Sequence, residues 1–90
     1  VTVEFPIDGT LDLHTFRPAD VGALVPEYID ACRERGIFEV RIIHGKGKGI
    51  LRERVHAILK RRRDVLSFHL DHGEAGGWGA TVVTLKPPQE

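Results

Sequence analysis

A glycine-rich segment directly follows an apolar run that ends at His44. Three glycines alternate with two lysines in this segment: Gly45, Lys46, Gly47, Lys48 and Gly49. Glycine permits positive φ and lets backbone N–H groups approach an anion, and the lysines supply positive charge. A helix that begins at about Gly49 adds the positive end of its dipole and its unpaired first-turn N–H groups, with Arg52 close by. The segment therefore predicts a phosphate-binding loop.

A carboxylate and an imidazole stand two residues apart earlier in the chain. Leu11 and Leu13 would line the buried face of an extended strand, since residues two apart share a face. Asp12 and His14 would then project together on the other face. Such a pair at the carboxyl end of a strand lies beside the loops that commonly build sites in α/β sheets. Taken alone, Asp12 could equally be a solvated residue or a loop cap, and His14 a surface histidine.

These residue types suit phosphodiester chemistry. His14 and His44 carry imidazoles, which ordinarily exchange protons near neutral pH, and Asp12 could orient one of them. RNA supplies its own 2′-hydroxyl nucleophile and needs no metal. DNA needs an attacking water, which favours a divalent ion such as Mg²⁺ on Asp12, with Asp8 as a second ligand. The chain has no strong all-protein metal cluster, so metal-independent RNA cleavage is favoured and DNA nicking stays open.

Two common nucleotide-binding loops do not fit the glycine-rich segment. A P-loop requires glycine, lysine and then serine or threonine where Ile50, Leu51 and Arg52 stand. A dinucleotide-binding loop would need glycine at the position of Ile50. The phosphate that the segment is expected to bind is therefore not assigned to either class of nucleotide site.

The composition predicts one small globular domain over residues 1–90. The net charge of zero hides an asymmetry, because residues 46–63 carry eight cationic side chains and one carboxylate. That segment therefore has a charge of +7, and the remainder has −7. A basic surface of this kind favours a nucleic-acid partner, although residues 60–63 could equally be the cationic end of a helix.

Hydropathy, the single cysteine and the absence of methionine bear on the location of the protein and on its possible chemistry. No run of about 18 apolar residues and no signal-peptide pattern is present, which predicts no membrane partner and a cytoplasmic location. The single cysteine, Cys32, lies in an apolar helical stripe and is expected to be a small buried hydrophobe rather than a nucleophile. The absence of methionine favours either a processed terminus at Val1 or a part of a larger polypeptide.

Hydrophobic periodicity predicts elements in the order β-α-β-α-β-β. Strands are expected over residues 7–14, 37–43, 65–70 and 80–85, and helices over about 18–36 and 49–62. Gly36 should end the first helix, and Pro26 should kink or interrupt it. The nearly continuous apolar content of residues 37–43 favours a strand buried within a parallel pair. The glycine-rich connection over 71–79 favours an antiparallel hairpin.

The predicted fold class is an α/β (α+β) two-layer sandwich with a mixed four-stranded sheet and two helices. If the first two strands are parallel, both strand-helix loops open at one sheet edge, which brings Asp12 and His14 near His44. Residues 1–10 are expected to form an N-terminal extended segment, with an edge strand or tail over 1–5, and residues 86–90 a tail. The second helix should turn five apolar residues toward the core, flanked by His56 as a structural residue: Ile50, Leu51, Val55, Ile58 and Leu59.

Three blocks of residues resemble the signature of the small MutS-related (Smr) domain family. They are Leu11-Asp12-Leu13-His14, His44-Gly45-Lys46-Gly47 running into Gly49-Ile50-Leu51-Arg52, and Gly77-Trp78-Gly79-Ala80-Thr81-Val82-Val83, and the resemblance covers about residues 11–85. It implies a fold similar to the C-terminal domain of a bacterial translation initiation factor. Smr domains occur alone or within larger proteins of DNA repair and RNA surveillance, and several nick DNA or cleave RNA.

The resemblance implies roles in cleavage or binding for Asp12, His14, His44, Gly45 and Gly47. The sequence departs from the family at Thr15, where members usually carry glycine, and this change bears more on cleavage than on binding. Two functions are therefore predicted. One is an endonuclease that acts on RNA or DNA. The other is a non-catalytic module in which the glycine-rich loop clamps a phosphodiester and Trp78 stacks on a base, although Trp78 could equally pack over the sheet edge.

Overall fold

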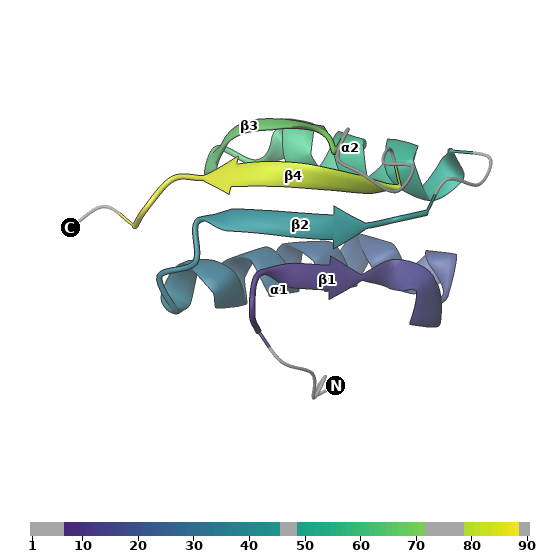
Figure 1. Cartoon of the computed structure of the whole chain (residues 1–90), viewed down its shortest axis with the longest axis horizontal. Coiled ribbons are helices and arrows are strands. Elements are labelled where there is room, and N and C mark those ends of the chain that lie inside the picture. The colour runs from purple at the N-terminus through teal and green to yellow at the C-terminus, as the bar shows by residue number, and fades with distance from the viewer. Residues whose placement is uncertain (1–6, 46–48, 72–78, 89–90) are drawn as a thin grey trace.

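The computed structural model describes residues 7–45, 49–71 and 79–88. Along these ranges the elements are β1 (Thr10–Asp12), η1 (Leu13–Thr15), η2 (Pro18–Asp20), α1 (Val21–Glu34), β2 (Glu39–Ile43), α2 (Ile50–Arg61), β3 (Val65–Leu70) and β4 (Ala80–Leu85). The elements η1 and η2 are short 3₁₀ turns, and Figure 1 shows the strands and the two α-helices. The predicted order β-α-β-α-β-β is confirmed. The strand or tail predicted over residues 1–5 lies outside the described residues.

The four strands form one mixed sheet in the order β1-β2-β4-β3. β1 and β2 are parallel, with Leu11 opposite Ile42. β4 lies between β2 and β3 and runs antiparallel to both. The pairing of β3 with β4 confirms the predicted antiparallel hairpin, and its register shifts between Val65 and Ser67.

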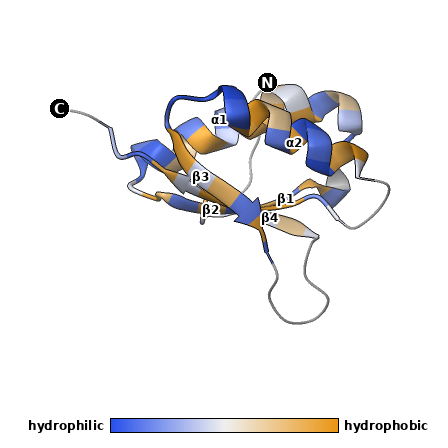
Figure 2. Cartoon of the chain, turned by 90° about the horizontal axis from the view of Figure 1, so that it is seen from above, coloured by the Kyte–Doolittle hydropathy of each residue, from blue (hydrophilic) through white to orange (hydrophobic). Residues whose placement is uncertain are grey.

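Both helices pack on one face of the sheet, so the molecule has two layers (Figure 2). The core between the layers includes Leu11, Val40, Ile42, Val83 and Leu85 from the sheet and Val21, Val25, Tyr28, Ile29, Cys32, Val55 and Leu59 from the helices. On the other face of β2, Glu39 and Arg41 are exposed. The predicted parallel pairing of β2 is confirmed by β1, but the predicted burial of β2 is wrong for the face that carries Glu39 and Arg41, because neither described helix covers it.

The first α-helix ends at a glycine in the left-handed conformation. Gly36 has a φ of 78°, and its N–H donates to the carbonyl of Arg33 at 3.1 Å. The next N–H, that of Ile37, donates to the carbonyl of Cys32 at 2.8 Å. These two bonds form a Schellman motif and confirm Gly36 as the end of the helix. Pro26 lies inside α1, which is continuous, so the helix does not restart there.

The second α-helix begins after Gly49, which has a φ of 85°. Val55 and Leu59 are buried as predicted, and Leu51 is partly buried. Ile50 is 58% exposed, so the prediction that it faces the core is wrong. At about 100° per residue, Ile50 lies outside the stripe that the core-facing residues form along the helix. Within the described residues, no helix is long and apolar enough to span a membrane.

The first strand is shorter than predicted. Its pairing ends at Asp12, and Leu13–Thr15 turn into the 3₁₀ element η1. Asp12 Oδ1 accepts the backbone N–H of His14 at 2.9 Å, which caps this turn. The two-residue period of a strand fails here because the carboxylate gives that N–H a local acceptor in place of a neighbouring strand.

Candidate functional site

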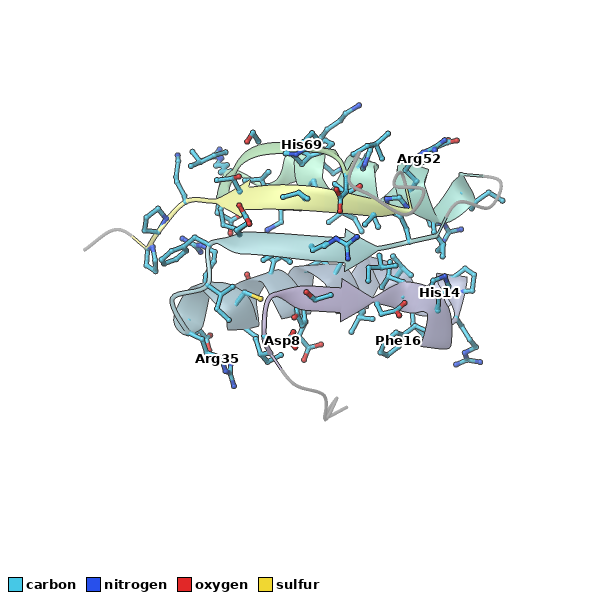
Figure 3. All side chains as sticks on the ribbon, in the orientation of Figure 1. Asp8, His14, Phe16, Arg35, Arg52 and His69 are labelled. Atoms are coloured by element: carbon cyan, nitrogen blue, oxygen red, sulfur yellow. The ribbon has the colours of Figure 1, made fainter. Side chains whose placement is uncertain are left out.

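The carboxyl ends of β1 and β2 lie at the same edge of the sheet, because the two strands are parallel. The chain that leaves β2 returns at this edge as the N-terminal end of α2. In Figure 3, His14 and Arg52 lie toward this end of the molecule, and Asp8 lies at the other end of β1. The predicted convergence of the first two strand-helix connections is thus present for the residues that the structure describes.

Asp12 and His14 form the exposed part of this edge. Asp12 Oδ1 lies 2.8 Å from His14 Nδ1 and also accepts the backbone N–H of His14. The side chains are 53% exposed for Asp12 and 63% for His14, and an ion pair so exposed contributes only about 0–1 kcal/mol to stability. The contact holds the His14 ring with Nδ1 toward the Asp12 carboxylate. The structure places His14 on the turn η1, and the prediction that it lies on the strand is wrong.

The imidazole of His14 lies against Gly45. A Cβ added to Gly45 would lie 3.2 Å from His14 Nε2, and the φ of Gly45 is 86°. The positive φ favours glycine, and a Cβ here would also press on the His14 ring. The N–H of Gly45 donates to the carbonyl of Gly79 at 2.8 Å, which extends the pairing of β2 toward the start of β4. Gly45 therefore joins the ends of β1, β2 and β4, with its own N–H engaged inside the protein.

His44 forms the buried part of the site. It is 5% exposed, with Nδ1 3.0 Å from the carbonyl oxygen of Gly45 and Nε2 2.8 Å from Thr81 Oγ1. Burial lowers the pKa of His44, the hydrogen bond to Gly45 raises it, and the charge of Arg52 lowers it further, with a net lowering. His44 is therefore neutral at neutral pH.

A second histidine shares the same threonine hydroxyl. His56 Nε2 lies 2.8 Å from Thr81 Oγ1, and its ring centroid is 6.1 Å from that of His44. The other side of the His56 ring packs on Phe68 at a centroid distance of 4.8 Å. Burial lowers the pKa of His56, and the pKa falls further because a proton on His44 and the charges of Arg52 and Lys60 oppose a positive charge on His56. The two rings thus meet at one hydroxyl between β4 and α2.

Sequence reasoning did not assign Thr81 or His56 to the site. The sequence places Thr81 in the predicted last strand and in the third of the blocks that carry the resemblance, without a role in the site, and it predicts His56 only as a structural residue beside an apolar stripe. The available signal was a hydroxyl at a core-facing position of β4, because a buried hydroxyl requires a hydrogen-bonding partner. Identifying the partners requires the tertiary structure, since they lie 37 and 25 residues away in the sequence.

Arg52 lies over the N-terminal end of α2. A Cβ added to Gly49 would meet its guanidinium at 2.7 Å. Within the described residues, no carboxylate forms an ion pair with Arg52. Gly49 supplies no capping side chain, so the first-turn N–H groups of α2 add the positive end of the helix dipole to the guanidinium charge. Glu53 also lies in this first turn, so the guanidinium of Arg52 and the positive end of the helix dipole stand beside one carboxylate.

Some of the predicted contacts cannot be placed at this edge. Four predicted phosphate-binding residues lie outside the described residues: Lys46, Gly47, Lys48 and Trp78. Asp8, the predicted second metal ligand, instead accepts the N–H of Thr10 at 3.0 Å and the hydroxyl of Tyr28 at 3.5 Å, at the start of β1. Across the described ranges, no cluster of three or more histidine, cysteine, aspartate or glutamate side chains could hold a metal ion.

The fold and this edge together define a small two-layer domain that joins a carboxylate–histidine pair to a glycine-rich strand-helix loop. Residues 11–86 match the Smr domain family, and the chain belongs to that family. The resemblance drawn from the three sequence blocks is confirmed.

Two solved structures support the fold. The Smr domain of Thermus thermophilus MutS2 matches with a TM-score of 0.80 and 35% identity, covering 87% of this chain and 98% of that structure. YdaL, a stand-alone small MutS-related protein from Escherichia coli, matches with a TM-score of 0.80 and 28% identity, covering 92% of this chain and 68% of that structure. The predicted fold class is confirmed.

Curated relatives are much longer than this chain. Endonuclease MutS2 of Geobacillus sp. (strain WCH70) is 43% identical over 83 residues, which are 92% of this chain and 11% of that protein. Endonuclease MutS2 of Lactiplantibacillus plantarum is 44% identical over 80 residues, 89% of this chain and 10% of that protein. The chain thus spans about a tenth of these relatives.

Proposed function

We propose that this Smr domain binds nucleic acid at the edge formed by β1, β2 and the N-terminal end of α2, and cleaves phosphodiester bonds there. The observation that carries the proposal is the 2.8 Å contact between Asp12 Oδ1 and His14 Nδ1, which turns Nε2 of the exposed imidazole toward Gly45. The name endonuclease that the MutS2 relatives carry supports the same class of activity. The chain is proposed to act within a longer polypeptide, as its relatives do.

The Asp12 carboxylate determines which nitrogen of the neutral His14 ring carries the proton. When His14 is neutral, Nδ1 carries the proton that Asp12 Oδ1 accepts, because a carboxylate oxygen only accepts. The lone pair of Nε2 is then available to take a proton from an entering hydroxyl, and the imidazolium can return it to a leaving oxygen. Asp12 stabilises that imidazolium by its negative charge.

The phosphate would lie between His14 and the start of α2. Arg52 and the first-turn N–H groups of this helix supply positive charge and donors that suit the oxygens of a phosphodiester. The predicted contributions of Lys46, Gly47 and Lys48 remain part of the proposal on the strength of the sequence. Gly45 and Gly49 contribute by backbone shape, since Gly45 uses its own N–H in the sheet.

RNA is the substrate class that this arrangement favours. A 2′-hydroxyl is an internal nucleophile, so one oriented imidazole can start the reaction without a metal ion. A proton-transfer role for His44 stays a prediction, but both of its ring nitrogens form hydrogen bonds inside the protein, which supports a positioning role better. DNA nicking would require a water nucleophile, and Mg²⁺ on Asp12 is the proposed alternative for that reaction.

A second candidate function is a nucleic-acid-binding module without catalysis. The observation in its favour is that Asp12 Oδ1 also caps η1 through the N–H of His14, a role that needs no chemistry. In that case the loop would hold the phosphodiester, and Trp78 is proposed to stack on a base. The two functions share the same surface and differ only in whether the bound strand is cut.

The deciding experiment compares cleavage with binding. Single-stranded RNA, structured RNA and supercoiled DNA are incubated with the domain in magnesium or in EDTA, together with Asp12→Asn and His14→Ala variants. We expect RNA to be cut in EDTA and to leave a cyclic phosphate. His14→Ala should lower the rate by about 10²–10⁴ with little change in affinity, because only proton transfer is lost. His69→Ala, at an exposed histidine of β3, is the matched control and should keep the wild-type rate.

Other outcomes discriminate between the alternatives. Cleavage that stops in EDTA and in Asp12→Asn, but persists in His14→Ala, would indicate a carboxylate-bound metal instead of imidazole catalysis. Salt-sensitive binding without cleavage of any substrate would refute the nuclease proposal for this chain and support the binding module.

A further inference from the structure

The hydrogen bonds around His44 have only one possible direction when both histidines are neutral. The carbonyl of Gly45 can only accept, so Nδ1 of His44 must carry the proton. Nε2 of His44 then has a lone pair, which can only accept the hydroxyl proton of Thr81. The hydroxyl oxygen is left to accept a proton from Nε2 of His56. The order of donation is therefore His56 to Thr81, Thr81 to His44, and His44 to the carbonyl of Gly45.

This chain of bonds ends at the residue that touches His14. Gly45 holds a φ of 86°, and its α-carbon faces His14 Nε2 closely enough that an added Cβ would lie 3.2 Å away. The N–H of Gly45 is fixed by Gly79, and its carbonyl by His44. Both polar groups of Gly45 are thus held, one by Gly79 directly before β4 and one by His44.

We propose that Thr81 and His56 are positioning residues, which hold His44 in the Nδ1–H form so that it fixes the carbonyl of Gly45 and, through Gly45, the place of His14. The part of this inference that concerns cleavage rests on the proposed function. Neither residue touches the exposed edge, so each acts through His44. A shift of about 1 Å at a reacting group can lower a rate by about 10²-fold, which is why two residues away from the exposed edge can matter for catalysis.

The first test measures which ring nitrogens carry protons, in the absence of nucleic acid. Two-bond ¹H–¹⁵N correlation spectra of the ¹⁵N-labelled chain, recorded above the ordinary titration range of histidine, distinguish the two neutral forms of each ring. We expect His44 as the Nδ1–H form and His56 as the Nε2–H form. His44 in the Nε2–H form, or as a mixture of both forms, would overturn the inference without any variant being made.

The second test uses a threonine pair with a matched control. Thr81→Val keeps the branched shape but removes the hydroxyl, so the Nε2 resonances of His44 and His56 should both move. Thr81→Ser retains the hydroxyl and should restore both resonances. Thr84→Val makes the same change on the other face of β4 and should leave them unmoved. His56→Phe provides a variant outside the sheet and should move the His44 Nε2 resonance in the same direction as Thr81→Val.

Kinetics separate a positioning role from a structural one. We expect Thr81→Val to lower the rate of RNA cleavage by roughly 10- to 100-fold while the affinity for the same RNA changes less than about twofold, and Thr81→Ser to recover the rate. An unchanged His44 spectrum in both Thr81→Val and His56→Phe would overturn the inference, as would wild-type cleavage by a Thr81→Val variant. If the wild-type chain cuts no substrate, the proposed nuclease function fails, and the spectra alone still decide whether the network positions His44.

Discussion

The two ends of α2 use their charged residues in opposite ways. At the C-terminal end, Arg62 donates to Asp64 through Nε at 2.8 Å and through a terminal nitrogen at 2.6 Å, and that nitrogen also reaches Asp30 at 2.5 Å. Arg33 lies 3.3 Å from the same Asp64 carboxylate. At the N-terminal end, within the described residues, Arg52 has no carboxylate partner.

The charged pairs of the two regions also differ in solvent exposure. The side chains of Arg62 and Asp64 are 20% and 16% exposed, and hydrogen bonding to Arg62 is the main reason that the pKa of Asp64 lies below its ordinary value. The hydrogen bond with Asp64 likewise raises the pKa of Arg62. By contrast, the side chains of Asp12 and His14, at the carboxyl end of β1, are more than half exposed. Charges that are paired and partly buried stabilise a fold, whereas exposed or unpaired charges remain able to bind a ligand.

Hydrophobic packing gives the largest expected difference between the two ends. Leu59 is fully buried near the C-terminal end of α2, so Leu59→Ala should lower the free energy of unfolding by about 2–5 kcal/mol. Ile50→Ala, at the exposed first residue of the helix, should change it by less than about 0.5 kcal/mol. Chemical denaturation of both variants measures the two changes in the free energy of unfolding. Equal losses would mean that the N-terminal end of α2 is as well packed as the other.

The ion cluster at the C-terminal end of α2, formed by Arg62, Asp64, Asp30 and Arg33, gives the next-largest expected change in stability. Arg62→Met leaves the Asp64 carboxylate without its main partner, so the free energy of unfolding at neutral pH should fall by about 3 kcal/mol. Because Asp64 has a lowered pKa, its contribution is present above its ordinary value of 3.8 and is lost as the pH falls through the lower folded value. The variant should therefore lose less stability on acidification than the wild type.

A neighbouring arginine provides the control for the ion cluster. Arg61→Met removes an exposed cation at the last residue of α2 and should change the free energy of unfolding by less than about 0.5 kcal/mol. The measurement is urea denaturation at several pH values. If both arginine variants were equally stable, the C-terminal cluster would not be structural, and the contrast between the two ends would fail.

Salt dependence tests whether the N-terminal end is the one that meets phosphate. Arg52→Gln should reduce the slope of log affinity against log salt for a nucleic acid by about one, because one phosphate contact and its counterion release are lost. Arg63→Gln changes an exposed cation beyond the other end of α2 and should leave the slope unchanged. A reduced slope in Arg63→Gln as well would show that the nucleic acid follows the whole length of the helix.

The buried His44 and the partly buried His56 give the smallest expected effect. The pKa values of His44 and His56 lie below the ordinary 6.5, so protonation favours the unfolded chain. Their stabilisation is complete above 6.5 and decreases as the pH falls toward the lowered folded values. Thermal denaturation between pH 7.5 and the onset of carboxylate titration should show this loss, and His56→Phe should reduce it. A melting temperature constant across that interval would contradict the assignment of two neutral rings in the folded chain.

Local patterns in the sequence predicted most of the elements and the sheet edge at which Asp12, His14 and His44 meet. The bounds of β3 and β4 agree with the prediction, and Gly36 ends α1 through a positive φ that its residue type permits. The parallel first two strands bring Asp12, His14 and His44 to one edge. These features follow from periodicity, turn chemistry and chain direction, which depend on residues close together in the sequence.

Only the tertiary structure decided which residues partner one another across the sheet. The insertion of β4 between β2 and β3 brings Thr81 beside His44, and α2 then brings His56 to the same hydroxyl. Strand order and burial depend on contacts between distant segments, which no local pattern specifies. For the same reason, the sequence identified His44 as a candidate for proton transfer, while the fold enclosed it and left the exposed imidazole of His14 oriented by Asp12.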